Sequence, residues 1–379
     1  MPYDGTGLAL VLEQAADLGG QERVVEALLR RYTAADAVAL RMPVTHRPDG
    51  PRPWWQERIR EIGPDTQIRR RSWLAPLYSR RMARLELPEV ELALSITHGG
   101  WSLTAQLPVG ARHVCYSSGL NTAIYTQAHL VRNDESPLVR PLLRLAVPVV
   151  HAHLRRLMER PDRVIANSHY SATGLAEAYG GAFEVLHPPV RTDFFTPGSS
   201  ANEGGHFLFV ARLNSHKRID LVVEAFRQLD EELVVAGGGP SLQRLRAIAP
   251  SNVTFLGPVY DGDLLELYRS SKGLVCPSVE TFGIAMCEAL ACGKPVIAPR
   301  RGGALEIVRD SRTGLLLDEV TVTAVAAAVR DVAARSFDPG ECRRSVERFS
   351  EANFIARMDE LLLDELARGR ITRPEPAAA

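Results

Sequence analysis

Short apolar runs alternate with helix-like segments along most of this chain, and that alternation constrains the fold more than any other feature. One repeat is especially clear. Residues 273–278 form an apolar run short enough for a buried strand, and 284–292 are mostly Ala, Leu, Met and Glu before Gly293 and Pro295 end the helix. Strands that alternate with helices predict a parallel, doubly wound α/β sheet, whose ligands bind at the carboxyl ends of the strands. The other strands that we predict are 7–12, 91–97, 112–116, 163–166, 207–211, 233–236 and 253–257.

The length of 379 residues predicts two or three domains. The polar segment 197–205, rich in Gly and Ser, is typical of a linker. We therefore predict an N-terminal domain over 1–193, completed by a C-terminal helix at about 350–372, and a second domain over 194–349. Residues 373–379 are expected to be disordered.

Composition excludes several classes of protein. The formal net charge is zero and 45% of the residues are apolar, which argues against a polyanion-binding tail and against a disordered chain. The sequence has no run of 18 apolar residues and no signal peptide at its start, so we expect a cytoplasmic protein. The five cysteines lack metal-ligand or redox spacing and are interpreted as buried thiols.

Two glutamates lie close together in the clearest repeat. Glu280 falls in the loop after the strand, and Glu288 about one turn inside the next helix. Between them, the helix start at Phe282, Gly283 and Ile284 presents backbone N–H groups and the positive end of the helix dipole, which suits a phosphate. This pattern would suit a nucleotide sugar, whose hydroxyls need acceptors and whose diphosphate needs donors. Taken alone, it is equally consistent with a purely structural role.

Three further positions are candidates of the same kind. Gly19 and Gly20 precede a helix, where a glycine pair lets the backbone approach a phosphate or simply makes a turn. Arg212 and Lys217 span a strand-helix junction, where they could reach one diphosphate or remain two exposed cations. His98 follows the strand 91–97, a place where a lone histidine is usually structural.

Because several motifs occur in one order from residue 19 to about residue 363, the chain resembles the retaining glycosyltransferases of family 4. Glu280 and Glu288 have the family's spacing of two glutamates, and the segments 293–298 and 302–306 fit as well. The resemblance implies the GT-B fold, in which two Rossmann-like doubly wound domains face each other across a cleft.

The resemblance also implies roles for the candidates around the diphosphate. Arg212 and Lys217, with the helix starts after Gly20 and Phe282, would neutralise the leaving diphosphate. These cations make a divalent metal unnecessary, and we single out no Asp-x-Asp motif for one. No cofactor is expected beside the nucleoside diphosphate sugar, which is the donor substrate.

The remaining roles concern the sugars. Glu288 would accept hydrogen bonds from the ribose, and His98 would face the donor sugar. Glu280 would hold the hydroxyls of that sugar in the catalytic site, and it is not assigned as nucleophile. Retention is thought to proceed by front-face attack within an ion pair, and the sequence leaves this step open.

The acceptor side departs from the closest branch of the family, the mannosyltransferases of cell-surface polysaccharide assembly. That branch commonly has His-x-Pro-x-Arg after a tyrosine, whereas this chain has Ser-Gly-Leu-Asn-Thr at 118–122. Ser118 and Asn121 are the acceptor-side candidates. GDP-mannose is the first donor hypothesis, and the acceptor hypotheses are a lipid-linked glycan and a small secondary metabolite. A sugar phosphorylase on the same fold and a non-catalytic nucleotide-sugar-binding partner of another transferase remain alternatives.

Residues 52–84 are unusually basic. The segment has nine arginines and three acidic residues, which gives it a local charge of +6. The arginines are interleaved with Trp54, Trp55 and Trp73. This pattern suits peripheral contact with anionic lipid or a phosphate-bearing acceptor, and equally a solvated helix face whose aromatic side chains pack on the domain. Single-stranded nucleic acid could use such a pattern too, but nothing else in the chain supports it, so no nucleic-acid partner is expected.

Overall fold

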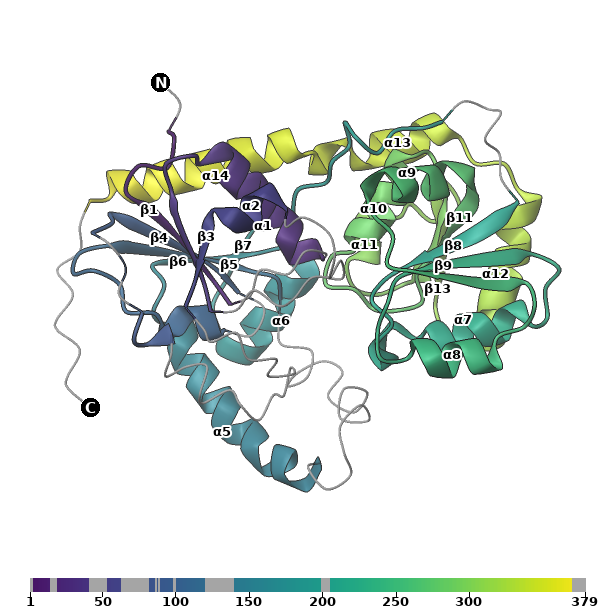
Figure 1. Cartoon of the computed structure of the whole chain (residues 1–379), viewed down its shortest axis with the longest axis horizontal. Helices are drawn as coiled ribbons and strands as arrows, with labels where there is room; N and C mark the ends of the chain where they lie inside the picture. The colour runs from purple at the N-terminus through teal and green to yellow at the C-terminus, as the bar shows by residue number, and fades with distance from the viewer. Residues whose placement is uncertain are drawn as a thin grey trace. The chain divides into compact units, whose positions relative to one another are not determined.

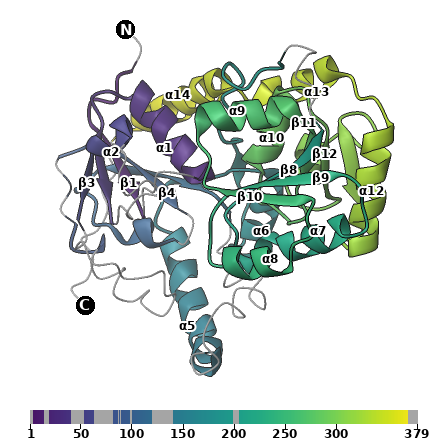
Figure 2. The same ribbon diagram turned by 45° about the vertical axis from the view of Figure 1, so that its right-hand side comes forward.

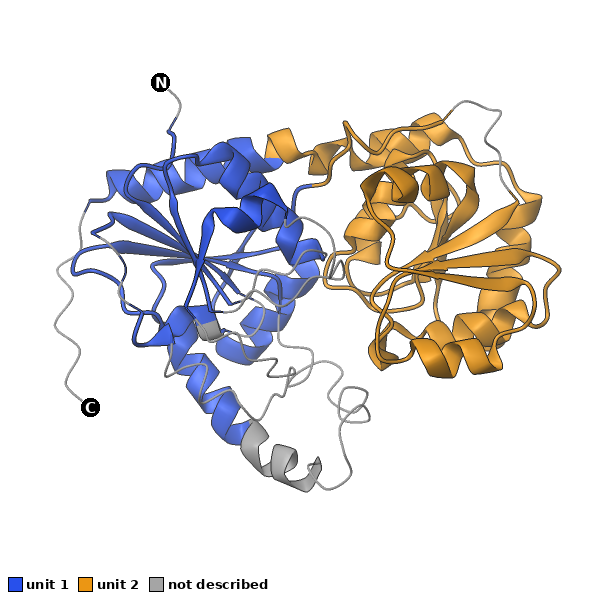
Figure 3. Ribbon diagram, viewed as in Figure 1, with its two compact units in different colours: residues 1–128, 135–189, 354–379 blue, residues 129–134, 190–353 orange. Residues whose placement is uncertain are grey.

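The computed structural model describes residues 3–13, 19–40, 53–62, 82–85, 87, 89–97, 100–119, 140–198 and 205–369. The chain separates into two compact units, coloured in Figure 3. Among the described residues, unit 1 contains those before residue 190 and those from 354 onward, and unit 2 contains 190–353. The domain limits given above remain a prediction, and the expected disordered tail lies outside the described residues.

Unit 1 is built on a parallel sheet of seven strands in the order β3-β2-β1-β4-β5-β6-β7. The order reverses at β1, which pairs with β2 on one side and with β4 on the other, so that Leu10 lies opposite both Ala37 and Leu94. The strands are β1 (Leu8–Leu12), β2 (Asp36–Ala39), β3 (Ile59–Glu61), β4 (Leu92–Thr97), β5 (Arg112–Ser117), β6 (Arg163–Ala166) and β7 (Glu184–Val185).

Helices cover both faces of this sheet (Figure 1). Side chains alternate along β5, because Val114 and Tyr116 join a core with the helices α1 and α14, whereas Cys115 packs with α5 on the other face. The helices of unit 1 are α1 (Gly20–Arg31), α2 (Trp54–Glu57), the 3-10 helix η2 (Trp101–Thr104), α5 (Arg140–Met158), α6 (His169–Tyr179) and α14 (Glu351–Ala367).

Helix α14 is an integral part of unit 1 although it comes last in the sequence. Its apolar face contributes Phe354, Met358, Leu361 and Leu362 to the core beneath β1, β4 and β5. On its polar side, Asp359 accepts hydrogen bonds at 2.7 and 3.1 Å from the Arg31 guanidinium and at 2.8 Å from the Tyr32 hydroxyl. The fully buried Glu365 lies 3.2 Å from Arg112 and 3.3 Å from Arg163.

Unit 2 repeats the architecture with a parallel sheet of six strands in the order β10-β9-β8-β11-β12-β13. Its order reverses between β8 and β11. The strands are β8 (His206–Val210), β9 (Glu232–Ala236), β10 (Val253–Gly257), β11 (Ser271–Val275), β12 (Val296–Pro299) and β13 (Gly314–Leu317).

The helices of unit 2 divide between the two faces of its sheet (Figure 2). One core cluster joins the sheet to α9, α10 and α13, and the other joins it to α7, α8 and α12. The helices are η4 (Ser215–Lys217), α7 (Ile219–Phe226), α8 (Leu242–Ile248), α9 (Asp261–Ser270), α10 (Ile284–Ala291), α11 (Ala304–Ile307), α12 (Val322–Ala334), α13 (Pro339–Val346) and η5 (Glu347–Phe349). The predicted doubly wound parallel sheets are confirmed, and each predicted strand is found within three residues of its expected limits.

Candidate functional site

The candidate site of unit 2 lies where the strand order reverses. Neighbouring parallel strands end at the same edge of a sheet, so the loops after β8 and β11 leave it side by side, and such a point is the usual ligand site of an open α/β sheet. Lys217 comes from the first loop and Glu280 from the second. The Lys217 Nζ lies 2.7 Å from each carboxylate oxygen of Glu280, and the two side chains are only 20% and 22% exposed.

The Glu280 carboxylate is stabilised in its charged form. Burial alone would raise the pKa of Glu280, but the Lys217 ammonium and the hydrogen bonds from Lys217 and Ser278 outweigh it and hold this pKa below its usual value. Glu280 is therefore ionised at neutral pH, and the ion pair is intact there.

Arg212 lies in the same loop as Lys217 and is half-buried. Among the hydrogen bonds and ion pairs of the described residues, none involves its guanidinium. A guanidinium carries five N–H donors in a planar fork that matches a phosphate. Of the two predicted cations, Lys217 thus forms an ion pair with an acidic side chain, whereas the N–H donors of Arg212 are available to a ligand.

A run of three glycines holds the loop that carries these cations. A Cβ atom on Gly237 would lie 1.9 Å from the carbonyl oxygen of Ala211, and one on Gly239 would lie 2.7 Å from the nitrogen of Leu213. The Leu213 N–H donates to the carbonyl oxygen of Gly238 at 2.9 Å. The glycines after β9 therefore let two backbones pack against each other, a role that the sequence alone did not indicate.

The loop that carries Glu280 is held in a similar way by the turn after β12. The Gly303 N–H donates to the Glu280 carbonyl oxygen at 2.9 Å, and a Cβ atom on Gly303 would lie 2.0 Å from the carbonyl oxygen of Phe282. The Phe282 ring is buried and packs edge-on against Phe349, with 5.1 Å between centroids. Of the predicted donor-binding residues, Phe282 therefore has only its backbone to offer.

Helix α10 begins at this loop, as predicted, with Gly283 at φ +117° as its N-cap. The N–H groups of Met286 and Cys287 donate to the Gly283 carbonyl oxygen at 3.0 and 3.3 Å. Within the described part of the chain, the N–H groups of Ile284 and Ala285 have no backbone acceptor. Two donors thus remain at the positive end of the helix dipole, where an anion binds favourably.

Glu288 lies one turn into α10, as predicted, and is 6% exposed. Its Oε2 accepts a hydrogen bond at 2.9 Å from the hydroxyl of Tyr268, a residue of α9 that is fully buried. Sequence reasoning missed Tyr268, because nothing in an apolar helical pattern distinguishes a packed tyrosine from a hydrogen-bonded one.

The candidates of unit 1 are only partly described. Gly19 is the N-cap of α1 and Gly20 its first residue, and a Cβ atom on Gly19 would lie 2.2 Å from a carboxylate oxygen of Glu22. A buried acidic side chain therefore lies at the helix start for which a phosphate was expected. Ser118 is half-buried at the end of β5, and its N–H donates to the carbonyl oxygen of Thr97 at 2.9 Å. His98 and Asn121 lie outside the described residues.

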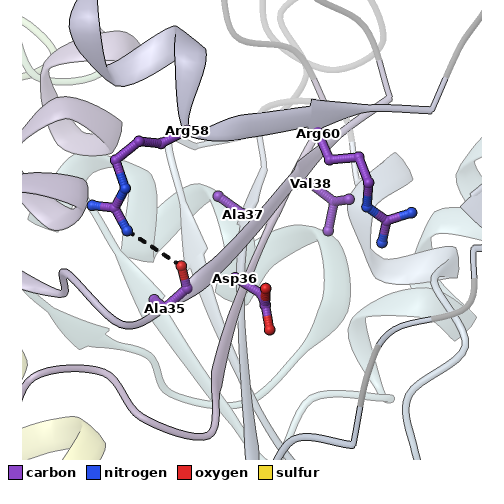
Figure 4. A pocket seen from close by; sticks show the side chains of 6 residues that line it. All are labelled: Ala35, Asp36, Ala37, Val38, Arg58 and Arg60. Atoms are coloured by element: carbon purple, nitrogen blue, oxygen red, sulfur yellow. Dashed lines mark hydrogen bonds between the residues drawn. The ribbon is translucent and has the colours of Figure 1, made fainter.

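The basic segment 52–84 is described at its ends only. Arg58 donates to the carbonyl oxygens of Leu29 at 2.5 Å and Thr33 at 2.9 Å, so it caps the end of α1. A pocket of about 250 Å³ lies beside it, lined by Ala35, Asp36, Ala37, Val38, Arg58 and Arg60 (Figure 4). Trp54 is 45% exposed and Trp55 is buried.

Two further observations concern metals and membranes. The chain contains one Asp-x-Asp spacing that the sequence analysis did not single out, Asp261 and Asp263, in the first turn of α9. Asp261 is bound there by Arg191, whose two terminal nitrogens lie 2.7 and 3.1 Å from its oxygens. Among the helices of the described residues, none combines the length and the apolar character needed to span a bilayer.

Two family models match this chain and together span most of it. Residues 18–194 match the model of glycosyltransferase family 4, and residues 191–353 match that of glycosyl transferases group 1. A D-inositol 3-phosphate glycosyltransferase of Mycobacteroides abscessus is 32% identical over 233 residues, which cover 55% of this chain and 52% of that protein. A GDP-mannose-dependent alpha-(1-6)-phosphatidylinositol monomannoside mannosyltransferase of Mycobacterium tuberculosis is 34% identical over 216 residues, covering 49% and 56%. The chain therefore spans about half the length of the curated relatives it matches.

Solved structures resemble the whole chain at low sequence identity. HepE of Anabaena, in complex with UDP and glucose, has a TM-score of 0.71 at 16% identity and covers 94% of this chain and 99% of its own. WaaG, a glycosyltransferase involved in lipopolysaccharide biosynthesis, has a TM-score of 0.69 at 16% identity and covers 93% and 99%. These likenesses establish the fold as GT-B.

Proposed function

This chain belongs to the glycosyltransferases of group 1 and family 4, and from that premise we propose that it is a retaining hexosyltransferase. It moves a hexose from a nucleoside diphosphate sugar to a hydroxyl acceptor. The observation that carries the proposal is the Lys217–Glu280 ion pair at the reversal of strand order in unit 2, beside the start of α10. Cation, carboxylate and helix start together offer what a diphosphate and a sugar need.

Each group has a defined part in this proposal. Arg212, Lys217 and the N–H groups at the start of α10 bind the diphosphate and stabilise the charge that develops as it leaves. A lysine beside a phosphate can keep one hydrogen bond to Glu280, since an ammonium has three donors. Glu280 then accepts from hydroxyls of the donor sugar, and Glu288 accepts from the ribose. His98 is proposed to face the donor sugar from unit 1, and Gly19 and Gly20 to approach the diphosphate.

Donor and acceptor are less constrained. We retain GDP-mannose as the first donor hypothesis, supported by the mannosyltransferase from Mycobacterium tuberculosis, while UDP-glucose follows from the ligands of HepE. The acceptor is a lipid-linked glycan or a small secondary metabolite, with Ser118 and Asn121 on its side. Peripheral contact with an anionic membrane through residues 52–84 would serve a lipid-linked acceptor.

The alternatives predict different behaviour. A sugar phosphorylase on the same fold would act on a sugar phosphate and on no nucleotide sugar. A non-catalytic partner of another transferase would bind a nucleotide sugar without turnover, and the departure at 118–122 from the mannosyltransferase pattern motivates it.

Calorimetric titration of GDP, UDP and ADP, and of their hexose conjugates, tests the proposal. One nucleotide should bind selectively, and Lys217→Ala should weaken it by about 10- to 100-fold, which is the loss of one charge-assisted hydrogen bond. Lys272→Ala is a matched control, because the Lys272 Nζ also pairs with a glutamate, Glu231, at 2.6 Å, but from the amino-terminal end of β11. Chelation by EDTA should leave the binding unchanged. If none of the nucleotides binds to the wild-type protein, the proposal is wrong.

A further inference from the structure

The buried contact between Tyr268 and Glu288 joins the candidate nucleotide site to the core of unit 2. Tyr268 lies in the last turn of α9 and Glu288 in α10, and their hydrogen bond of 2.9 Å is buried. Glu288 belongs to the motif that the proposed function assigns to the ribose. Tyr268 belongs to no motif singled out in the sequence.

The packing of the Tyr268 ring positions its hydroxyl. Its ring meets the Phe195 ring edge-on, with 5.6 Å between centroids and 88° between the planes, and both residues are fully buried. Arg343 fixes the backbone around Phe195, because its guanidinium donates to the carbonyl oxygens of Phe195 at 3.1 Å, Ala291 at 3.2 Å and Thr192 at 3.0 Å. Because the ring is held in place, its hydroxyl donates to Glu288 from a fixed position.

The chemistry of the pair is asymmetric. Burial first, and then the charge of Glu288 and the hydrogen bond to it, raise the pKa of Tyr268 well above its usual value, so its hydroxyl remains a donor. A carboxylate accepts at about four lone-pair sites on two oxygens. A donor at a fixed position on Oε2 therefore restricts the rotation of the carboxylate and, with it, the direction in which Oε1 accepts.

We propose that Tyr268 is the positioning residue for ribose recognition: its hydroxyl holds the Glu288 carboxylate in the orientation that accepts hydrogen bonds from a ribose diol. This inference rests on the proposed function, because it assumes that the ligand is a nucleoside diphosphate. It extends that function by adding a residue that contacts no substrate but determines how well the site distinguishes a ribose from a sugar without hydroxyls.

The test compares a nucleoside diphosphate with its 2′,3′-dideoxy counterpart in calorimetric titrations of wild type and Tyr268→Phe. In the variant, affinity for the ribonucleotide should fall about 5- to 20-fold, while affinity for the dideoxynucleotide should change less than about 2-fold. The matched control is Tyr116→Phe. Tyr116 is equally buried, and its hydroxyl donates to the Leu186 carbonyl oxygen at 3.0 Å in unit 1. Tyr116→Phe should lower the melting temperature to a similar extent and leave both affinities unchanged.

A double-mutant cycle separates positioning from general damage. If Tyr268 acts through Glu288, then Glu288→Ala, which removes both acceptor oxygens, should abolish the preference for the ribonucleotide, and adding Tyr268→Phe should weaken ribonucleotide binding no further. Equal losses for the two nucleotides in Tyr268→Phe, or no loss for either, would overturn the inference.

Two outcomes distinguish this inference from the function beneath it. If the wild type binds none of the nucleotides, the proposed function fails. If it binds one of them with and without the ribose hydroxyls equally well, the function stands and the ribose role of Glu288 and Tyr268 is wrong. Should Tyr268→Phe not fold, Phe195→Leu is the second variant. It frees the tyrosine ring without removing its hydroxyl, and an unchanged ribose preference there would contradict the inference.

Discussion

Replacing Gly303 by alanine tests how the loop that carries Glu280 is held. Gly303 has an ordinary helical φ of −61°, so alanine meets no backbone strain there. Its new Cβ would lie 2.0 Å from the Phe282 carbonyl oxygen, and Cβ atoms essentially never come closer than 3.0 Å to another heavy atom, so the two backbones must separate by at least about 1 Å. Overpacking of this kind costs about 1–3 kcal/mol, and loss of the hydrogen bond from Gly303 to Glu280 adds about 1 kcal/mol.

The expected loss of about 3 kcal/mol corresponds to a fall of about 6–12 °C in melting temperature for a unit of this size, measured by circular dichroism. Nucleotide affinity should fall as well, since Glu280 and the start of α10 move together. Gly262→Ala is the control, because a Cβ atom there meets nothing within 4 Å in the first turn of α9, and it should raise stability by about 0.5–1 kcal/mol. If Gly303→Ala melts within about 1 °C of wild type, the reasoning from close packing is refuted.

Three other predictions concern charges and thiols. Asp359→Asn removes the ion pair between Asp359 in α14 and Arg31 in α1. Urea denaturation should show that the free energy of unfolding falls by about 1–2 kcal/mol. A fall of less than about 0.5 kcal/mol would count against a stabilising role for this ion pair. Because the folded-state pKa of Glu280 is depressed below its usual 4.5, the ion pair with Lys217 stabilises fully above that value and is lost as the pH falls through the folded pKa. The gap in unfolding free energy between wild type and Lys217→Ala should therefore narrow as the pH falls below about 4.5, and a constant gap would exclude the ion pair as its source. Burial, reinforced by the charge of Glu280, raises the pKa of Cys276 to about 12. At pH 8, iodoacetamide should therefore modify this thiol at least about 100-fold more slowly in the native protein than in urea. Peptide mass spectrometry measures the two rates.

Local sequence pattern was sufficient to predict eight of the described strands, the parallel sheets and the start of α10. It missed the strands β2, β3, β7, β12 and β13. Each of the predicted features depends on a short stretch, such as the apolar run before Glu280 or the stop at Gly293, whose physical meaning does not depend on distant residues. The positions of Glu280 in a loop and Glu288 one turn into the helix followed from the same reasoning and are confirmed.

Contacts between distant segments could not be predicted in that way. Lys217 and Glu280 are 63 residues apart, and only the reversal of strand order brings their loops together. The tight packing of Gly237 and Gly303 against other backbones appears only in three dimensions. The same holds for Tyr268, whose partner is set by the packing of α9 on α10.

The late position of α14 in the sequence has a consequence for biosynthesis. The described residues of unit 2 all fall within 190–353, so all of its described core residues have been synthesised before α14 is complete. Unit 1 lacks Phe354, Met358, Leu361 and Leu362 until the ribosome has passed them, although its first strand is made more than 300 residues earlier. Domains usually fold in the order in which they are translated. In this protein, the second unit can complete its core first, and the first unit is left with an open apolar face that needs protection from aggregation until α14 emerges.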